Sequence, residues 1–312
     1  MAKTRGLAFY TGELEKLEPG LLKPLTSTNW PRDIYCEMGA GHVEVISKAS
    51  ANELDPGAGV EGLGRGTKND IPRIIMDTSK ETWRTFNWTR LLQLDYLDNQ
   101  LMKTAGRCLE DMLRDGLQLA FDKYVDENVY KGFEKLGTTG LINSPNVPAR
   151  LADPGVSGQR TWEHKNPDEI LWDVNQAMVD AWVTSEHDNL GIVNHILIPP
   201  EKYALLVSKR IGDAAQVSVL TYLMENNLGK ARNVALKIFP SPWCKGAGIN
   251  GTDRMMAYVN DKECLQFDIT VPLHRTMSET SAEHHAYLFT YFAQVSEVQF
   301  RRLETVTYYD GI

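Results

Sequence analysis

Two histidines next to two glutamates are the side chains of this sequence that most resemble a reactive site. The stretch "SETSAEHH" carries Glu279, Glu283, His284 and His285. If this stretch is helical, the glutamates lie one turn apart beside the histidines, and such carboxylate and imidazole groups can bind zinc. A hydrolase or metal enzyme that uses Glu283, His284 and His285 is therefore one hypothesis. The spacing H-E-x-x-H is absent, however, and H-x-x-E-H would need histidine where Thr280 stands. We therefore interpret these residues as the solvated face of a helical connector and predict no metal site.

A glycine-rich stretch, residues 55–72, raises the possibility of a phosphate-binding loop. Gly57, Gly59 and Gly62 match the pattern G-x-G-x-x-G. Such a loop follows a strand and opens a helix, because the free N–H groups of the helix N-terminus bind the phosphate. Here "NELDP" precedes the first glycine, and the glycines lead into "NDIPR". We therefore predict no nucleotide or other cofactor, and we expect the glycines at the tip between two strands.

No motif for nucleophilic catalysis is present. The sequence lacks G-x-S-x-G, and its four cysteines are widely scattered without a C-x-x-C pair. Cysteines in this pattern are typical of reduced thiols packed as small apolar groups, so we expect neither a disulfide nor a zinc framework. We assign no catalytic residue and predict that the protein is not an enzyme.

The composition is that of a folded chain. Of its 312 residues, 42% are hydrophobic, which can supply a substantial core. No run approaches the roughly 18 apolar residues of a membrane span, and the first ten residues lack the apolar centre of a signal peptide, so we expect a cytoplasmic location. The net charge of −8 disfavours tight, direct binding to DNA, because proteins that grip nucleic acid usually carry a basic surplus.

The first half of the chain is expected to combine an irregular start, a hairpin and a long helix. Glycine and proline interrupt residues 3–31, which leaves room for only a short helix at "ELEKLE". Alternating residues predict strands at "HVEVISKAS", "IPRIIMDTS" and "TWRTFNWT". A long helix is expected from about Leu91 to Tyr130. Its predicted buried face carries Leu109, Leu113, Leu117, Ala120 and Tyr124.

The second half reads as a mixed region followed by strands. Asn166 as N-cap, Pro167 at the first helical position and Glu169 at the third predict the start of a helix. A strand is expected at "IVNHILIPP", helices at "EKYALLVSKR" and "AAQVSVLTYLMENN", and a strand at "NVALKIFPSPW". From "MMAYVND" onwards β-favouring runs dominate, so the predicted fold class is α+β.

In this order of elements the chain resembles the major capsid proteins of tailed bacteriophages, which share the Hong Kong 97 (HK97)-type fold with cellular encapsulins. The resemblance covers nearly the whole chain. It rests mainly on "DIPRIIMD", "GTTGLINSPNVP", "DEILWDVNQAMVDAW", "HILIPPEKYALL" and "QFRRLETVTYYDGI". The most family-like residues are Gly140, Leu141, Asn143 and Pro145, with Asp310, Gly311 and Ile312 as a weaker motif.

The resemblance implies five parts. These are an N-terminal arm (1–30), an extended β-hairpin loop that lies over an adjacent subunit (31–78), a peripheral domain with the long helix as its spine (79–159), an axial domain that meets its copies around five-fold and six-fold axes (160–262), and strands that return to the peripheral domain (263–312).

It also implies a structural role, in which pentamers and hexamers of this chain build an icosahedral phage head around double-stranded DNA without sequence-specific binding. The implied partners are other copies of the chain, a separate scaffolding protein, a portal protein and a decoration protein. The scaffolding protein is expected to be separate because the chain has no long N-terminal scaffolding segment. The implied location is the virion, after assembly in the host cytoplasm. The alternative is the shell of an encapsulin-type compartment. Covalent cross-linking through Lys48 or Lys68 is not expected, because no acid can be located to deprotonate the amine.

Overall fold

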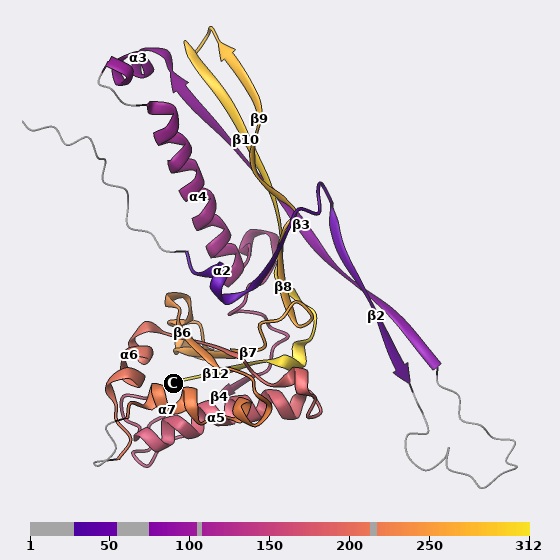
Figure 1. The fold of residues 1–312 in the computed structure, drawn as a ribbon, viewed down its shortest axis with the longest axis vertical. Coiled ribbons are helices and arrows are strands. Elements are labelled where there is room, and N and C mark those ends of the chain that lie inside the picture. Colours follow the sequence, from indigo (N-terminus) through magenta and orange to yellow (C-terminus); the bar gives the residue numbers. More distant parts are fainter. Residues whose placement is uncertain (1–27, 55–74, 105–107, 213–216) are drawn as a thin grey trace, which may run out of the picture.

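The computed structural model describes residues 28–54, 75–104, 108–212 and 217–312. These residues form a body, which contains a five-stranded sheet, and a long, narrow sheet that extends from the body in two directions (Figure 1). The short helix predicted at "ELEKLE" and the glycine stretch at 55–72 lie outside the described residues.

The body is built on a sheet of strand order β4-β12-β7-β5-β6. Its strands are β4 (Ala149–Leu151), β12 (Val306–Asp310), β7 (Arg254–Tyr258), β5 (His195–Ile198) and β6 (Lys237–Pro240). Every residue of β5, β7 and β12 is buried, as in strands that are covered on both faces. One face shares a core with helix α5 (Pro167–Thr184), where Val174 and Met178 join Met255 and Tyr309. The body therefore has a helix layer on this side of its sheet.

The other face of the body sheet packs against the end of a long helix. Tyr258 and Tyr308 on this face share a core with Val125 and Val129 of α4 (Leu109–Lys131). Side chains that alternate along each strand therefore enter two different cores. The sheet lies between α5 and the C-terminal half of α4.

The helices of the body follow the sequence prediction closely. At α5, the side chain of Asn166 accepts from the N–H at the third helical position, and Glu169 accepts from the N–H of Asn166 at 2.8 Å, so the predicted capping box is confirmed. The predicted strands at β5 and β6 and helix α6 (Pro200–Ser208) are also confirmed. The next helix, α7 (Val219–Glu225), is shorter than the helix predicted at "AAQVSVLTYLMENN": it begins where the side chain of Ser218 accepts from the N–H of Thr221, and it ends before Asn226. Short 3₁₀ turns occur at Glu134–Leu136, Asn189–Gly191, Leu228–Arg232, Pro242–Cys244, Ile249–Gly251 and Leu303–Thr305.

The long sheet has the strand order β2-β3-β10-β9. Its strands are β2 (Val45–Leu54), β3 (Ile75–Asp95), β10 (Ala286–Ser296) and β9 (Val271–Ser281). Strand β3 spans the whole sheet, because it pairs with β2 up to Arg84 and with β10 from Thr85 onwards. Figure 1 shows the β2–β3 hairpin beside the body, at the lower right, and the β3, β10 and β9 end above it. A third sheet, formed by β1 (Tyr35–Met38), β8 (Leu265–Ile269) and β11 (Gln299–Phe300), joins the long sheet to the body.

The predicted helix from Leu91 to Tyr130 is wrong in its first part. Residues 91–95 end strand β3, and the helical region is divided into α3 (Tyr96–Thr104) and α4. Leu92 and Leu94, two positions apart, are both buried, as expected for one face of a strand. The sequence "LLQLD" is compatible with a helix or a strand, and its pairing with β10 makes it a strand. Among the described residues, no helix is both long enough and apolar enough to cross a membrane.

The predicted buried face of α4 is only partly confirmed. Leu109, Leu113, Leu117 and Tyr124 are half-buried and Ala120 is exposed. The fully covered residues lie near the C-terminal end of the helix, where Phe121, Val125, Val129 and Tyr130 meet the sheets. The amphipathic pattern identified the helix but not the half of it that enters the core.

The four-residue helix α2 (Trp30–Asp33) links the N-terminal side of the chain to both α4 and the body. Asp126 of α4 accepts from the backbone N–H of Asn29 at 2.9 Å, from the backbone N–H of Trp30 at 3.1 Å and from Trp243 Nε1 at 2.9 Å. The buried carboxylate of Asp33 accepts from the Tyr130 hydroxyl, and the Asp33 carbonyl accepts from the Tyr258 hydroxyl. These bonds fix the point from which residues 39–54 leave the body.

Candidate functional site

The residues predicted as a reactive set lie in an exposed turn. Strand β9 continues to Ser281, and Glu283, His284 and His285 lie in the four-residue turn that joins β9 to β10. The predicted helical connector is therefore wrong, because Glu279 pairs across the sheet with Leu288 instead of preceding Glu283 by a helical turn.

This turn is tied to helix α3. The carbonyl of His285 accepts from the N–H of Tyr96 at 3.1 Å, and the two rings meet edge to face at 5.2 Å. Within the described residues, no group of three or more histidine, cysteine, aspartate or glutamate side chains is placed to hold a metal ion. The structure therefore assigns the turn a role in joining two elements.

All four cysteines are free, as predicted, but they are not equally covered. Cys244 and Cys264 are buried, Cys36 is half-buried and Cys108 is exposed, so the expectation of packed thiols fails at Cys108. Burial raises the pKa of the Cys36 and Cys244 thiols to about 12 and that of Cys264 to about 11. These three thiols carry almost no thiolate near neutral pH and are poor nucleophiles.

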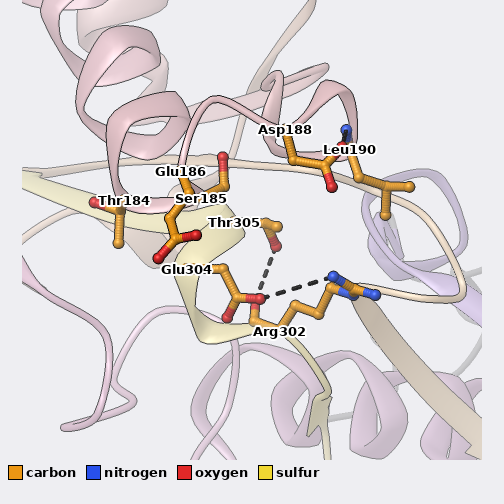
Figure 2. A pocket seen from close by; sticks show the side chains of 8 residues that line it. All are labelled: Thr184, Ser185, Glu186, Asp188, Leu190, Arg302, Glu304 and Thr305. Atoms are coloured by element: carbon orange, nitrogen blue, oxygen red, sulfur yellow. Dashed lines mark hydrogen bonds and ion pairs between the residues drawn. The ribbon is translucent and has the colours of Figure 1, made fainter. Parts of the chain in front are cut away.

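A polar cavity of about 330 Å³ lies beyond the end of α5 (Figure 2). The guanidinium of Arg302 faces the Glu304 carboxylate at 4.0 Å, and the Ser185 hydroxyl donates to the carbonyl of Trp182 at 2.9 Å. Because the serine hydroxyl bonds to a carbonyl, no base holds it as a nucleophile. The cavity is lined mainly by polar and charged side chains.

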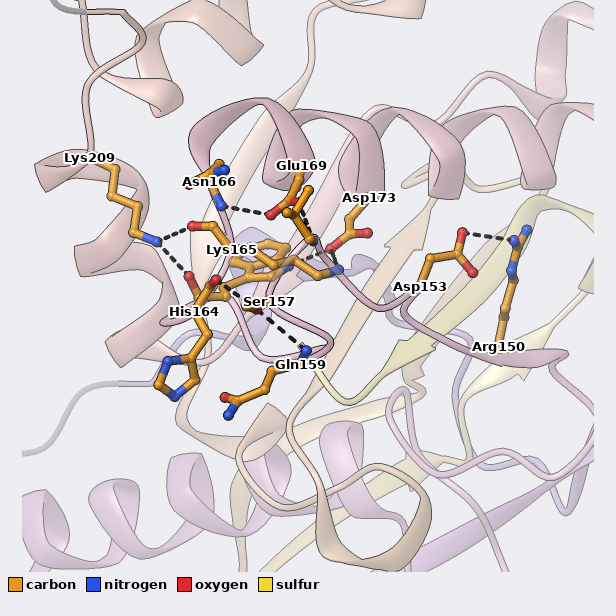
Figure 3. Close-up of polar contacts among 12 residues, drawn as sticks. Arg150, Asp153, Ser157, Gln159, His164, Lys165, Asn166, Glu169, Asp173 and Lys209 are labelled. Atoms are coloured by element: carbon orange, nitrogen blue, oxygen red, sulfur yellow. Dashed lines mark hydrogen bonds and ion pairs between the residues drawn. The ribbon is translucent and has the colours of Figure 1, made fainter.

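A buried polar cluster holds the loop that precedes α5 (Figure 3). Lys165 Nζ lies 2.6 Å from Asp173 Oδ2, which also accepts from Trp162 Nε1 at 2.9 Å. Lys209 Nζ donates to the carbonyls of Trp162 and Lys165 at 2.6 Å. These bonds pair the buried charges and fasten the loop to α5 and to the residues that follow α6.

The same loop presents apolar side chains to solvent. The Glu169 carboxylate accepts from the N–H of Val156 at 2.6 Å, which fixes a valine side chain that is 91% exposed. The N–H groups of Val156 and Asn166 hold the pKa of Glu169 below its usual range. Next to this loop Trp172 is 61% exposed and lines a cavity of about 300 Å³. An exposed tryptophan of this kind is typical of a contact surface.

A second apolar surface lies at the end of the long sheet that is far from β2. It consists of Leu91, Leu97, Leu101 and Met277, which we call the tip patch and whose exposed fractions are 61%, 65%, 69% and 70%. In the sheet, Leu91 pairs with Thr290, which pairs with Met277, so these three side chains share one face. Figure 1 places this end of the sheet and α3 together, far from the body.

Among the residues that the structure describes, one edge of the β2–β3 hairpin has no partner strand. Strand β2 bonds to β3 on one side and is the edge strand of the sheet on the other. Lys48, one of the two lysines considered for cross-linking, is half-buried on β2, and Lys68 lies outside the described residues. A two-stranded hairpin is marginally stable alone in water, so this hairpin needs another surface to pack on.

The residues that look most family-like from the sequence have structural roles. A Cβ on Gly140 would lie 2.3 Å from the carbonyl carbon of Tyr130. The amide of Asn143 donates to the carbonyl of Lys131 at 2.8 Å and accepts from the N–H of Gly140 at 2.7 Å. The motif therefore closes the C-terminal end of α4, where backbone carbonyls lack helical partners.

The C-terminal motif is also structural. Arg254 Nε and Nη2 donate to the two oxygens of Asp310 at 2.7 and 2.8 Å, and its Nη1 donates to the carbonyl of Ile142 at 2.5 Å. This buried pair connects the chain end to the segment after α4. Gly311 has a φ of +81°, and Ile312 is buried.

The sequence did not identify the exposed apolar surfaces. Leu97 and Leu101 are four residues apart, which is the same spacing that marks a face buried within the chain. A pattern of this kind signals that a surface will be covered, but not whether the cover belongs to the same molecule.

Comparisons with known proteins give a consistent result. A family model described as "Major capsid protein" matches residues 62–312. A search of curated proteins finds no match.

Solved structures resemble the chain over nearly its full length. The capsid of the Myoviridae phage XM1 has a TM-score of 0.77 at 14% identity and covers 96% of this chain and 98% of its own. The capsid of a native GTA particle has a TM-score of 0.67 at 10% identity, with 98% of each chain covered. A virus-like particle from Pyrococcus furiosus has a TM-score of 0.52 at 13% identity and covers 91% of this chain and 92% of its own. At these identities the likeness concerns the fold, and it confirms the predicted α+β, HK97-type class.

Proposed function

The chain belongs to the major capsid protein family, and from this premise we propose that its copies assemble as pentamers and hexamers into the icosahedral head of a bacteriophage. In this role the protein acts mechanically. It buries apolar surface between copies, and it needs no catalytic residue and no cofactor.

The observation that carries the proposal is apolar surface left uncovered on projecting elements. Four large side chains of the tip patch are each more than 60% exposed, although they lie on well-formed strands and a helix. Soluble monomers rarely expose clustered apolar side chains, and such clusters mark interaction sites. Copies of the same chain are the partners that a capsid protein requires.

We propose that the parts expected from the sequence keep their roles, with residues 31–78 lying over an adjacent subunit, 79–159 forming a peripheral domain, and 160–262 surrounding the five-fold and six-fold axes. Residues 1–30 would be the N-terminal arm and 263–312 the return strands. Within the last range, β12 lies between β4 and β7, so the chain end is part of the body sheet. This pairing would keep the proposed axial and peripheral parts from separating when copies rearrange.

We also propose that the shell encloses double-stranded DNA without gripping it. The chain has 41 acidic and 33 basic residues, and an acidic wall repels phosphate instead of binding it. A separate scaffolding protein, a portal protein and a decoration protein remain proposed partners, and the host cytoplasm remains the proposed site of assembly.

Electron microscopy of the purified chain, produced in bacterial cells, tests this function. We expect closed shells, or rings of five and six copies when no scaffolding protein is supplied. Particles of fixed size that hold folded cargo protein would instead support the encapsulin-type alternative. Particles from infected cells that protect genome-length DNA from nuclease would support the phage head.

A further inference from the structure

A surface cavity of about 430 Å³ lies where helix α2 and strand β1 meet the body. Arg32, Tyr35 and Met38 line it from the α2–β1 side, and His195 and Lys237 line it from β5 and β6. The side chains of Tyr35 and Met38 are 41% and 63% exposed. The cavity therefore combines an apolar wall with two cationic side chains, at the point where the chain leaves the body for the β2–β3 hairpin.

The positive charge of this cavity is only partly balanced. Arg32 Nε lies 2.6 Å from Asp33 Oδ1, so the guanidinium is paired. Lys237 is exposed and has no ion pair within the described part of the chain, and none of the described residues that line the cavity is acidic. Burial and then the charges of Lys237 and Arg32 lower the pKa of His195, and no carboxylate raises it. A carboxylate that enters the cavity is therefore attracted to Lys237.

A stretch of matching chemistry precedes the described residues. The sequence "GELEKLE", residues 12–18, carries three glutamates, two leucines and one lysine, whereas the first ten residues carry two basic residues and no acidic one. The description begins at residue 28, so the intervening chain can span up to about 33 Å when extended. Attachment through such a short linker gives the acidic stretch an effective concentration on the order of millimolar at the cavity.

We propose that residues 12–18 bind in this cavity of their own chain, with a glutamate carboxylate at Lys237 and the leucines against Tyr35 and Met38. The inference is independent of the proposed function, because it concerns a single subunit. Helix α2 and strand β1 form one wall of the cavity, and β5 and β6 form the other. The bound stretch would therefore hold the start of the hairpin against the body. The acidic stretch of another copy has the same charge but lacks the short linker, so the same chain is favoured.

Cross-linking in the full-length chain tests the inference. The background is Cys108→Ser, which removes the exposed native thiol, and Glu15→Cys is combined in it with Met38→Cys. We expect a short bis-maleimide to join the two thiols within one chain, which stays at the single-chain mass of 35.1 kDa on a denaturing gel and yields the linked peptides in mass spectrometry. The control combines Glu15→Cys with Val156→Cys, at a residue that is 91% exposed elsewhere on the body, and should not be linked. Linkage between two chains, or equal linkage at positions 38 and 156, would overturn the proposal.

Charge reversal tests the part played by Lys237. Placed in the Glu15→Cys/Met38→Cys chain, Lys237→Glu is expected to lower the yield of the link about fivefold, because it removes an exposed ion pair. Lys135→Glu is the matched control, since Lys135 is also exposed but does not line the cavity, and it should leave the yield unchanged. Both variants should keep the melting temperature of the parent chain, because surface substitutions rarely change stability by much. Equal yields in the two variants would overturn the proposed site.

Discussion

The second glycine of "GTTGLINSPNVP", Gly140, is required by a close backbone approach. At Gly140 an added Cβ would lie 2.3 to 2.5 Å from backbone atoms of Tyr130 and Lys131, which cannot move without displacing the end of α4. We expect Gly140→Ala to lower the free energy of unfolding by about 2–3 kcal/mol, since overpacking of this size forces the backbone to shift. Urea unfolding followed by circular dichroism measures the change.

Gly116, in the middle of α4, is the matched control. An added Cβ there meets no atom within 4 Å. We therefore expect Gly116→Ala to raise the free energy of unfolding by up to about 1 kcal/mol, because alanine loses less conformational entropy in a helix. Equal effects of the two substitutions would show that the close approach at Gly140 is not what requires glycine.

A buried histidine gives the body a defined response to acid. Burial, with Lys237 and Arg32 nearby, lowers the pKa of His195 from 6.5 to about 4. The unfolded chain therefore binds this proton at a higher pH than the folded chain does. The stabilisation is complete above pH 6.5 and is lost as the pH falls from 6.5 towards 4.

We expect His195→Gln to reduce the loss of unfolding free energy between pH 6.5 and pH 4, by up to about 3 kcal/mol. Glutamine has no proton to gain in this range, and its amide can still bond to Asn194, which lies 2.8 Å from His195 Nδ1. Urea unfolding at several pH values gives both slopes. Identical slopes for the variant and the wild type would contradict the assignment.

At the scale of elements, the part of the long helix that is buried in the core lies nearer to its C-terminal end than the sequence predicted. Val129 is completely buried, whereas Leu113 is half-buried. We expect Val129→Asp to abolish soluble expression, because an unpaired buried carboxylate costs several kcal/mol. Leu113→Asp should still yield soluble, folded subunits. Comparing soluble yield and melting temperature of the two variants decides the matter, and loss of soluble protein in both would contradict it.

The hairpin that contains β2 and β3 is expected to serve assembly and not folding of the subunit. Its strands form no part of the body sheet. We predict that deleting residues 56–68 leaves a soluble, folded subunit that fails to form closed shells. Electron micrographs with intact capsids from this deletion would count against the role of the hairpin.

The sequence predicted the elements that are marked by their own residues, such as a helix cap or an apolar run. It did not predict the strands whose structure depends on pairing with another strand. The cap at Asn166 and the apolar run of β5 were specific enough to predict α5 and this inner strand of the body sheet. Residues 91–95 and "SETSAEHH" were assigned to helices, because the spacing of their residues does not show whether a strand will pair with them. Strand β10 decided both cases: it pairs with residues 91–95 from almost 200 residues away along the chain, and with Ser278–Ser281 across a four-residue turn.

At the scale of the whole molecule, the order of elements was predictable and the contact surfaces were not. The resemblance to capsid proteins named the fold, which the structural comparisons confirm. The tip patch was not predicted, since an apolar stripe looks the same in a sequence whether its cover lies within one chain or between chains. Only the three-dimensional placement of α3 shows that its leucines face outward.

The most direct test of the central claim is the particle mass of the purified chain, measured by multi-angle light scattering. A single chain has a mass of 35.1 kDa. The account predicts rings of five and six chains, or shells many times heavier, because the tip patch and the β2–β3 hairpin need neighbouring copies to cover them. A stable species of one chain mass at all concentrations, in which both projections pack on their own body, would contradict it.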